Sequence, residues 1–287
     1  MAATRSLEAL GLSGDPMAAP LSYPGALPGE DGVLVDGCYL PLRHAPARQV
    51  GSWLVEIGDT PVELDVLLEK EGRPITGDRF PVVSVGSNAA PAQLHGKFVR
   101  EGVRPLVPLV NARVFGMAAG VSAHVSRAGY IPGTGVLLSG GVVSLFVAWL
   151  DADELQVIDA SEPNYYRVLL DGSIYPVVLP SGERLGACSL YVSKWGCLVG
   201  RDGNPRPLAS QNELLAALLA ESRSLRQIFG GTPESFVERA AADASKREEA
   251  QHIFRREGWV RPQPELEQLR ERPVAEQTYA TSGSYCT

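Results

Sequence analysis

The chain has 287 residues, of which 45% are hydrophobic and 21% are charged, the usual composition of a globular protein with a sizeable core. Acidic residues outnumber basic residues by 33 to 26, which gives a formal net charge of −7. This balance disfavours nucleic acids and anionic membranes as partners, because both require a basic protein surface.

The four cysteines are scattered and form no CxxC pair. A zinc site is therefore not expected, and so few cysteines are typical of a reducing compartment. Residues 1–12 lack the basic and apolar regions of a signal peptide, and no apolar run reaches membrane-spanning length. These features predict a cytoplasmic protein.

Residues 1–78 are interpreted as an N-terminal extension with some β structure. Residues 13–31 are rich in proline and glycine, which predicts a loop or linker. Short apolar runs at 32–37, 53–57 and 62–68 predict strands. We find no catalytic pattern in this extension.

A buried strand and a small polar turn follow. Residues 80–85 predict the strand, and Gly86, Ser87 and Asn88 form the turn before a helix that includes Pro91. Glycine tolerates unusual dihedrals, and serine and asparagine are good N-caps. Several backbone N–H groups would then point at one spot, which suits a carboxylate, a phosphate or an oxyanion. An ordinary capped turn is the competing interpretation. Ser87 is not assigned as a nucleophile, because no GxSxG motif is present.

A second candidate lies where a short helix meets a strand. Asp151 and Glu154 have the spacing of a capping box at the start of that helix. Pro163 disfavours a helical conformation at Glu162, and residues 165–170 predict the strand. Apolar and aromatic neighbours would desolvate the Glu162 carboxylate, so that it could exchange a proton near neutral pH. The competing interpretation is an exposed carboxylate at a helix end.

The order of elements, closely spaced strands and then helices, predicts an α+β fold with a largely antiparallel or mixed sheet. Residues 79–207 are expected to form the main domain and residues 208–260 a helical extension. Within that extension, helices are predicted at 210–230 and 232–257. The remaining residues, 261–287, are charged and then rich in Ser, Thr and Tyr, which predicts a disordered tail.

Two stretches in this order resemble the γ-glutamylcyclotransferase superfamily. The first is Val82-Val83-Ser84-Val85-Gly86-Ser87-Asn88, which is similar to the family's strand and Tyr-Gly-Ser-Asn turn. The second is Val157-Ile158-Asp159-Ala160-Ser161-Glu162, followed by Tyr165-Tyr166-Arg167, which is similar to its Leu-Asp-x-x-Glu helix end and next strand. The resemblance covers about residues 80–219 and implies a small mixed β-barrel with flanking helices, to which the N-terminal β extension and C-terminal helices are added.

The resemblance also implies a pocket for a γ-glutamyl small molecule at the barrel mouth. Glu162 would take a proton from the substrate α-ammonium and return it to the departing amine, releasing 5-oxoproline without a metal or an organic cofactor. The family's substrate-holding loop corresponds to Gly86, Ser87 and Asn88. We assign three further residues to substrate binding: Val85, Tyr166 and Tyr191.

Two positions depart from the family pattern. Val85 stands where the family has a tyrosine, and Glu213 occupies a second tyrosine position at the start of a late helix, where it can serve as a capping residue. Two alternatives therefore stay open. One is a non-catalytic small-molecule-binding or interaction protein on the same fold. The other is an amide hydrolase or acyl transferase in which Glu162 activates water. The sequence specifies neither the leaving amine nor the oligomeric state.

Overall fold

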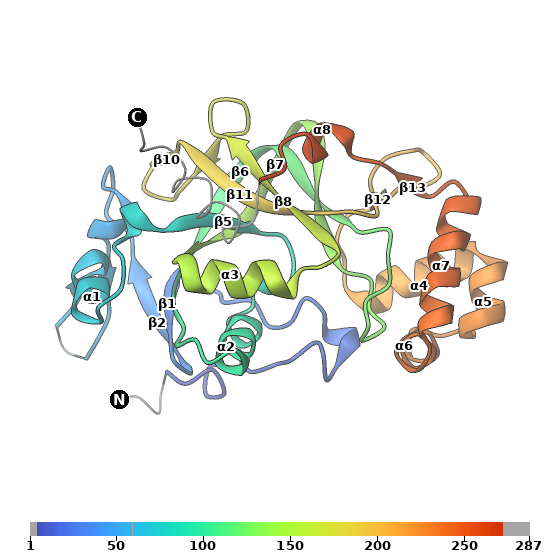
Figure 1. The fold of residues 1–287 in the computed structure, drawn as a ribbon, viewed down its shortest axis with the longest axis horizontal. Helices are drawn as coiled ribbons and strands as arrows, with labels where there is room; N and C mark the ends of the chain where they lie inside the picture. Colours follow the sequence, from blue (N-terminus) through green and yellow to red (C-terminus); the bar gives the residue numbers. More distant parts are fainter. Residues whose placement is uncertain (1–4, 59, 272–287) are drawn as a thin grey trace, which may run out of the picture.

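The structure, a computed structural model, describes residues 5–58 and 60–271. A large mixed sheet occupies the middle of the molecule (Figure 1). The strands β1 and β2 and the helix α1 lie at one end of the molecule, and the helices α4 to α7 gather at the other end. Two further helices, α2 and α3, lie beside each other below the sheet in this view. The fold is therefore α+β, as predicted.

The main sheet follows the order β4-β3-β2-β1-β6-β7-β5-β11-β8, and β9 joins β6 to β10. Its pairs are antiparallel except for the parallel pair β5–β11, so the sheet is mixed. Its strands are β1 (Gly32–Val35), β2 (Cys38–Arg43), β3 (Leu54–Val55), β4 (Val62–Glu63), β5 (Phe80–Ser84), β6 (Leu106–Val121), β7 (Gly133–Leu150), β8 (Tyr165–Asp171), β9 (Val177–Val178), β10 (Arg184–Leu185) and β11 (Ala187–Ser193).

A closed barrel is not found. Among the described strands, the hydrogen-bonded path begins at β4 and ends at β8, and no ladder joins these two ends. The long β6–β7 hairpin bends instead at a bulge between Phe115 and Met117, where Gly116 has a φ of 75°. Bulges increase the local twist of a sheet. The described sheet is therefore open, with a bulge in its longest hairpin.

The N-terminal strands extend this same sheet. β1 pairs with β6 along its whole length, from Gly32 opposite Leu109 to Val35 opposite Leu106. The strand predicted at 62–68 is largely wrong, because β4 is followed at once by the helix α1 (Leu64–Lys70). Leu64, Leu67 and Leu68 are buried on one face of that helix, and this i, i+3, i+4 spacing is helical.

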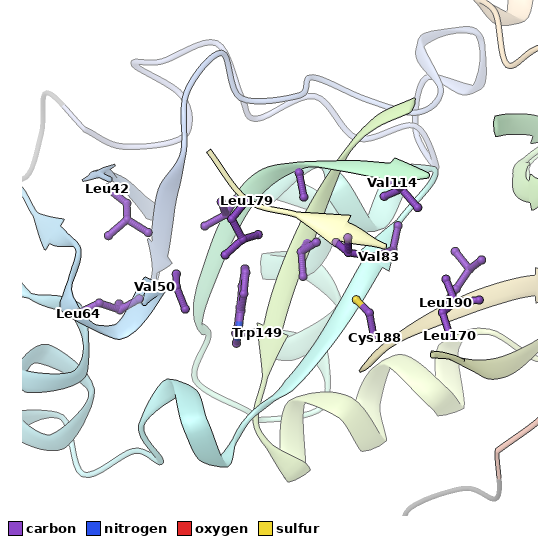
Figure 2. Packing of buried hydrophobic residues seen from close by; sticks show 14 of the residues in the cluster. Leu42, Val50, Leu64, Val83, Val114, Trp149, Leu170, Leu179, Cys188 and Leu190 are labelled. Carbon is purple, nitrogen blue, oxygen red and sulfur yellow. The ribbon is translucent and has the colours of Figure 1, made fainter. Parts of the chain in front are cut away.

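One hydrophobic core runs from this N-terminal end through the middle of the sheet (Figure 2). Leu42 and Leu64 contribute from the N-terminal side, and Val83 and Trp149 contribute from the central strands β5 and β7. These side chains are almost fully buried. Burial on this scale fixes β5 in the sheet, and β5 leads directly into the polar turn at Gly86.

A second core lies between the sheet and the helices α2 (Pro91–Arg100) and α3 (Ala152–Ser161). Leu94 and Phe98 of α2 meet Leu155 and Ile158 of α3 in this core. The predicted capping box at the start of α3 is confirmed, because the Asp151 and Glu154 side chains each accept the other residue's backbone N–H. This packing places the end of α3 next to α2.

The helical extension contains shorter helices than predicted. The first predicted helix is divided into α4 (Gln211–Glu221) and α5 (Arg223–Phe229), and the second into α6 (Pro233–Ala242) and α7 (Ala244–Arg256). Ser222 and Asp243 end one helix and cap the next in extended conformation. Their side chains offer backbone N–H groups a local alternative to the helical bond.

The predicted disorder from residue 261 onward does not hold for residues 261–271. The strand β13 (Val260–Arg261) pairs with β12 (Cys197–Leu198), and a short helix α8 (Pro264–Glu267) follows. Leu266 of α8 is fully buried in the main core. Residues 272–287 lie outside the described part of the chain. Across residues 5–58 and 60–271, no helix has the length and apolar character needed to cross a bilayer.

Candidate active site

A cavity of about 510 Å³ opens beside the end of β5. Its wall is formed by segments that are distant in sequence: the turn after β5, the helix α2, the loop before β7 and the junction between α3 and β8. Met17 and Tyr23 of the N-terminal extension also line it. The cavity therefore brings together both stretches singled out in the sequence.

The turn after β5 has a different local structure from the one predicted. A single 3-10 turn (Ser87–Ala89) follows Gly86, and α2 begins at Pro91. Neither helical segment has a side-chain cap, so the capping role predicted for Ser87 and Asn88 is wrong. Gly86 has a φ of −130°, and it is required for close approach: a Cβ there would overlap the Tyr23 hydroxyl. The polar side chain of Asn88 is thereby free to face the cavity.

Asn88 and Glu162 meet directly in the cavity. Asn88 Nδ2 donates to Glu162 Oε1 at 3.1 Å. Lys97 Nζ donates to the same carboxylate oxygen at 2.8 Å and to Asn88 Oδ1 at 2.7 Å. The side chains of Lys97 and Glu162 are 14% and 16% exposed. These three residues form a closed triangle of hydrogen bonds on one wall.

This triangle corrects one expectation about Glu162. The sequence predicts an apolar and aromatic environment, whereas the carboxylate is half-buried against a cation and an amide. Both partners hydrogen-bond the charged form of a carboxylate. The contact of Glu162 with Lys97 and Asn88 could not be predicted from the sequence. Lys97 and Asn88 lie nine positions apart on two helical segments, and Glu162 is more than 60 residues away.

A buried cluster of charged side chains connects the two parts of the site, the turn after β5 and the end of α3. Arg79, just before β5, donates to Glu154 of α3 at 3.0 Å, and Arg73 donates to both Asp151 and Glu154. Burial lowers the pKa of Arg79 and raises that of Glu154, and the ion pair between them offsets part of the cost of burying both charges. The strand carrying the Gly86 turn is thus tied to the helix that ends at Glu162.

A buried histidine also lines the cavity. His124 is 3% exposed, and burial lowers its pKa to about 4, so the imidazole is neutral at pH 7. Its Nδ1 lies 2.5 Å from Ser122 Oγ, which lies 2.7 Å from Ser193 Oγ. Because Ser193 Oγ accepts the Trp195 amide N–H, its own proton is available to Ser122, and Ser122 can donate to His124 Nδ1. This direction uses every hydroxyl proton and leaves the imidazole proton on Nε2.

Most of the predicted site residues lie on this one cavity, and one does not. Tyr191 lies at the edge of the cavity, where its hydroxyl donates to Asp159 Oδ1 at 2.6 Å. Tyr166 lines a second cavity of about 150 Å³, which shares Glu162 and Tyr191 with the first, and both Lys194 and Arg270 lie over its ring. Glu213 accepts from Ser210 Oγ at the start of α4 and does not line the cavity. The predicted residues that line the cavity are Val85, Gly86, Ser87, Asn88, Glu162 and Tyr191.

Sequence reasoning missed several residues of this cavity. Lys97 was not singled out in the sequence, His124 was not assigned to the site, and Tyr23 lies in a stretch interpreted as a linker. Tyr165 was seen only as part of a strand, although its hydroxyl donates to Gly133 O at 3.0 Å. No local pattern distinguishes these residues, because each reaches the cavity through the tertiary fold.

No family model and no curated protein sequence matches this chain. Two solved structures are similar to it. The solution structure of an Arabidopsis thaliana protein has 18% sequence identity and a TM-score of 0.31, covering 53% of this chain and 89% of its own. A gamma-glutamyl cyclotransferase has 15% identity and a TM-score of 0.34, covering 62% of this chain and 98% of its own. Likeness at this level does not assign a function, so the functional argument rests on the cavity itself.

Proposed function

We propose that the cavity binds a γ-glutamyl small molecule and that Glu162 catalyses its cyclisation. One observation carries the proposal: Glu162 and the turn at Gly86 lie on the same cavity, and Asn88 links them through a 3.1 Å hydrogen bond. A carboxylate that can act as a base therefore lies beside two side-chain donors, Asn88 Nδ2 and Lys97 Nζ. General acid–base catalysis of acyl transfer requires both of these components.

The proposed reaction moves two protons through Glu162. The carboxylate accepts a proton from the substrate α-ammonium, and the freed amine attacks the γ-carbonyl carbon. A new C–N bond closes a five-membered ring, and the bond to the leaving amine breaks as Glu162 returns its proton to that nitrogen. The carboxylate then takes the surplus proton from the ring nitrogen and passes it to the departing amine. The products are 5-oxoproline and a free amine, and these steps consume no water and need no metal or organic cofactor.

The charges on the cavity wall favour an anionic ligand. Lys97, Arg100 and Arg127 line the cavity, and Glu162 is the one acidic side chain among its described lining residues. The chain as a whole carries a net charge of −7, so this local excess of positive charge is not a property of the general surface. A γ-glutamyl compound has an α-carboxylate that would meet these cations.

The test is the variant Glu162→Gln, which keeps the shape of the side chain and removes its capacity to exchange a proton. We expect release of 5-oxoproline to fall by at least a hundredfold, since general acid–base catalysis contributes about 10²- to 10⁴-fold. Glu213→Gln is the matched control, because that carboxylate lies at the start of α4, outside the cavity, where it accepts from Ser210 Oγ. Undiminished release by a folded Glu162→Gln protein would contradict the proposed role.

A binding protein without turnover is a second candidate, and the ion pair favours it. Lys97 already occupies Glu162 Oε1, the kind of position that a substrate ammonium would require. Incubation with a panel of γ-glutamyl amides, followed by mass spectrometry, separates the candidates. 5-Oxoproline indicates cyclisation, glutamate indicates that Glu162 activates water, and binding with no product indicates a receptor.

A further inference from the structure

The N-terminal stretch that the sequence predicts as a linker is built into the wall of the cavity. Gln93 Nε2 of α2 donates to Asp15 Oδ1 at 2.5 Å, and the Tyr130 hydroxyl lies 3.8 Å from Met17 Sδ. Tyr23 stacks on Tyr130 with ring centroids 4.4 Å apart and an interplanar angle of 18°. The segment is thereby attached to two separate parts of the cavity wall.

Tyr23 places its hydroxyl beside the turn that would hold the ligand. The residue is 4% exposed, and its oxygen accepts the Gly133 N–H at 2.8 Å. A Cβ on Gly86 would overlap this hydroxyl. The backbone N–H of Ser87 also hydrogen-bonds the phenol oxygen, an effect that by itself lowers the pKa of Tyr23. The phenol oxygen is therefore held against the turn from two sides.

The Tyr23 hydroxyl donates no hydrogen bond to any described residue. Burial raises the pKa of Tyr23 far above neutrality, so the phenol keeps its proton. Its oxygen accepts from Gly133, and none of the described residues takes the proton in return. Tyr165 provides a contrast, because its hydroxyl donates to Gly133 O at 3.0 Å. Two phenols thus contact the backbone of Gly133, Tyr23 at its N–H and Tyr165 at its carbonyl oxygen, and of these two only the proton of Tyr23 is available to a ligand.

We propose that Tyr23 is a substrate-binding residue that donates a hydrogen bond to an acceptor oxygen of the ligand. The inference rests on the proposed function for the class of ligand, a γ-glutamyl compound with carbonyl and carboxylate oxygens. The position of Tyr23 in the cavity wall does not depend on that function, because it follows from the contacts of the Tyr23 hydroxyl with Gly86 and Gly133. The N-terminal segment accordingly forms part of the binding site.

The test measures ligand binding by Tyr23→Phe, which keeps the ring and its stacking on Tyr130. Tyr39→Phe is the matched control, because Tyr39 is a buried tyrosine of the N-terminal region whose hydroxyl donates to Glu30 O, away from the cavity. L-γ-glutamyl-L-alanine and L-glutamate are titrated by calorimetry into proteins that also carry Glu162→Gln, so that turnover does not interfere. We expect Tyr23→Phe to bind about tenfold more weakly and Tyr39→Phe to bind unchanged.

The outcomes distinguish this inference from the proposed function. Binding weakened by Tyr23→Phe, with no 5-oxoproline formed by the wild-type protein, would sustain the role of Tyr23 and overturn the cyclisation. Turnover by the wild-type protein together with unchanged affinity of folded Tyr23→Phe would overturn the role of Tyr23 alone. If the protein binds neither compound, both proposals are wrong.

A second measurement covers the case in which Tyr23→Phe fails to fold. 3-Fluorotyrosine introduced at position 23 retains the hydroxyl, and its ¹⁹F resonance reports the hydrogen bonding of that phenol. Addition of L-γ-glutamyl-L-alanine should shift this resonance, whereas 3-fluorotyrosine at position 39 should not respond. An unshifted resonance at position 23 under saturating ligand would overturn the inference.

Discussion

Replacement of Gly86 by alanine tests the packing on which the cavity depends. The added Cβ would overlap the Tyr23 hydroxyl and approach Tyr23 Cζ to 3.1 Å. Tyr23 has little freedom to move away, since its ring stacks on Tyr130 and its oxygen accepts from Gly133 N. The variant must therefore displace either the turn after β5 or the tyrosine.

Two costs follow from that displacement. Insertion of a methyl group into a packed site costs about 1 to 3 kcal/mol. Loss of the tyrosine oxygen leaves the buried Gly133 N–H without a partner, which costs roughly a further 1 to 3 kcal/mol. Because the two effects share one side chain, we expect the free energy of unfolding to fall by about 2 to 5 kcal/mol in total.

Urea unfolding followed by circular dichroism measures this change, with Gly96→Ala as the control. Gly96 lies inside α2 with nothing within 4 Å of its hypothetical Cβ, so alanine there should stabilise the helix by up to about 1 kcal/mol. Both substitutions replace glycine by alanine, yet Gly86→Ala should lower the free energy of unfolding and Gly96→Ala should raise it. A Gly86→Ala protein as stable as the wild type, with its ligand affinity retained, would refute the proposed fit between Tyr23 and the turn.

Two further predictions concern charge in the cavity. Lys97→Met keeps the length of the side chain and removes its bonds to Glu162 and Asn88, so calorimetry should show at least tenfold weaker binding of L-γ-glutamyl-L-alanine; unchanged affinity would exclude a role for this cation. His124 has a pKa of about 4 in the folded state, against about 6.5 when unfolded, so the unfolded chain gains the proton first as the pH falls. Between pH 7 and pH 4, the free energy of unfolding measured with urea should fall by about 3 kcal/mol because of this group. His124→Gln should remove that part of the pH dependence.

The sequence predicted the features that depend on neighbouring residues. The capping box of Asp151 and Glu154 is confirmed, because it involves groups three positions apart. The strand at 80–85 is also confirmed, as β5 (Phe80–Ser84), since its apolar run lies between Arg79 and a glycine-containing turn. Such signals are complete within a few residues.

Features that depend on distant partners could not be predicted in this way. The capping role expected of Asn88 was wrong, because Asn88 lies inside the 3-10 turn and its side chain hydrogen-bonds Lys97 and Glu162, the latter 74 positions away. A sheet closes into a barrel only if its two edge strands pair, and the sequence of a single strand does not specify this pairing. The division of the long helices at Ser222 and Asp243 likewise reflects a competition between capping and propagation.

The N-terminal segment illustrates how a site can include residues that have no recognisable motif. Proline and glycine between residues 13 and 31 correctly predict irregular backbone, yet irregular backbone can be held as firmly as a helix when its side chains are buried. Tyr23 is held by a ring stack and one hydrogen bond, and the glycine at position 86 leaves the space that its hydroxyl fills. The requirement for glycine in the turn is therefore explained by a residue 63 positions earlier rather than by the turn's own dihedral angles. If Tyr23 donates to the ligand as proposed, the polar turn and the supposed linker are two parts of one binding surface, and substitutions in either should act on the same affinity.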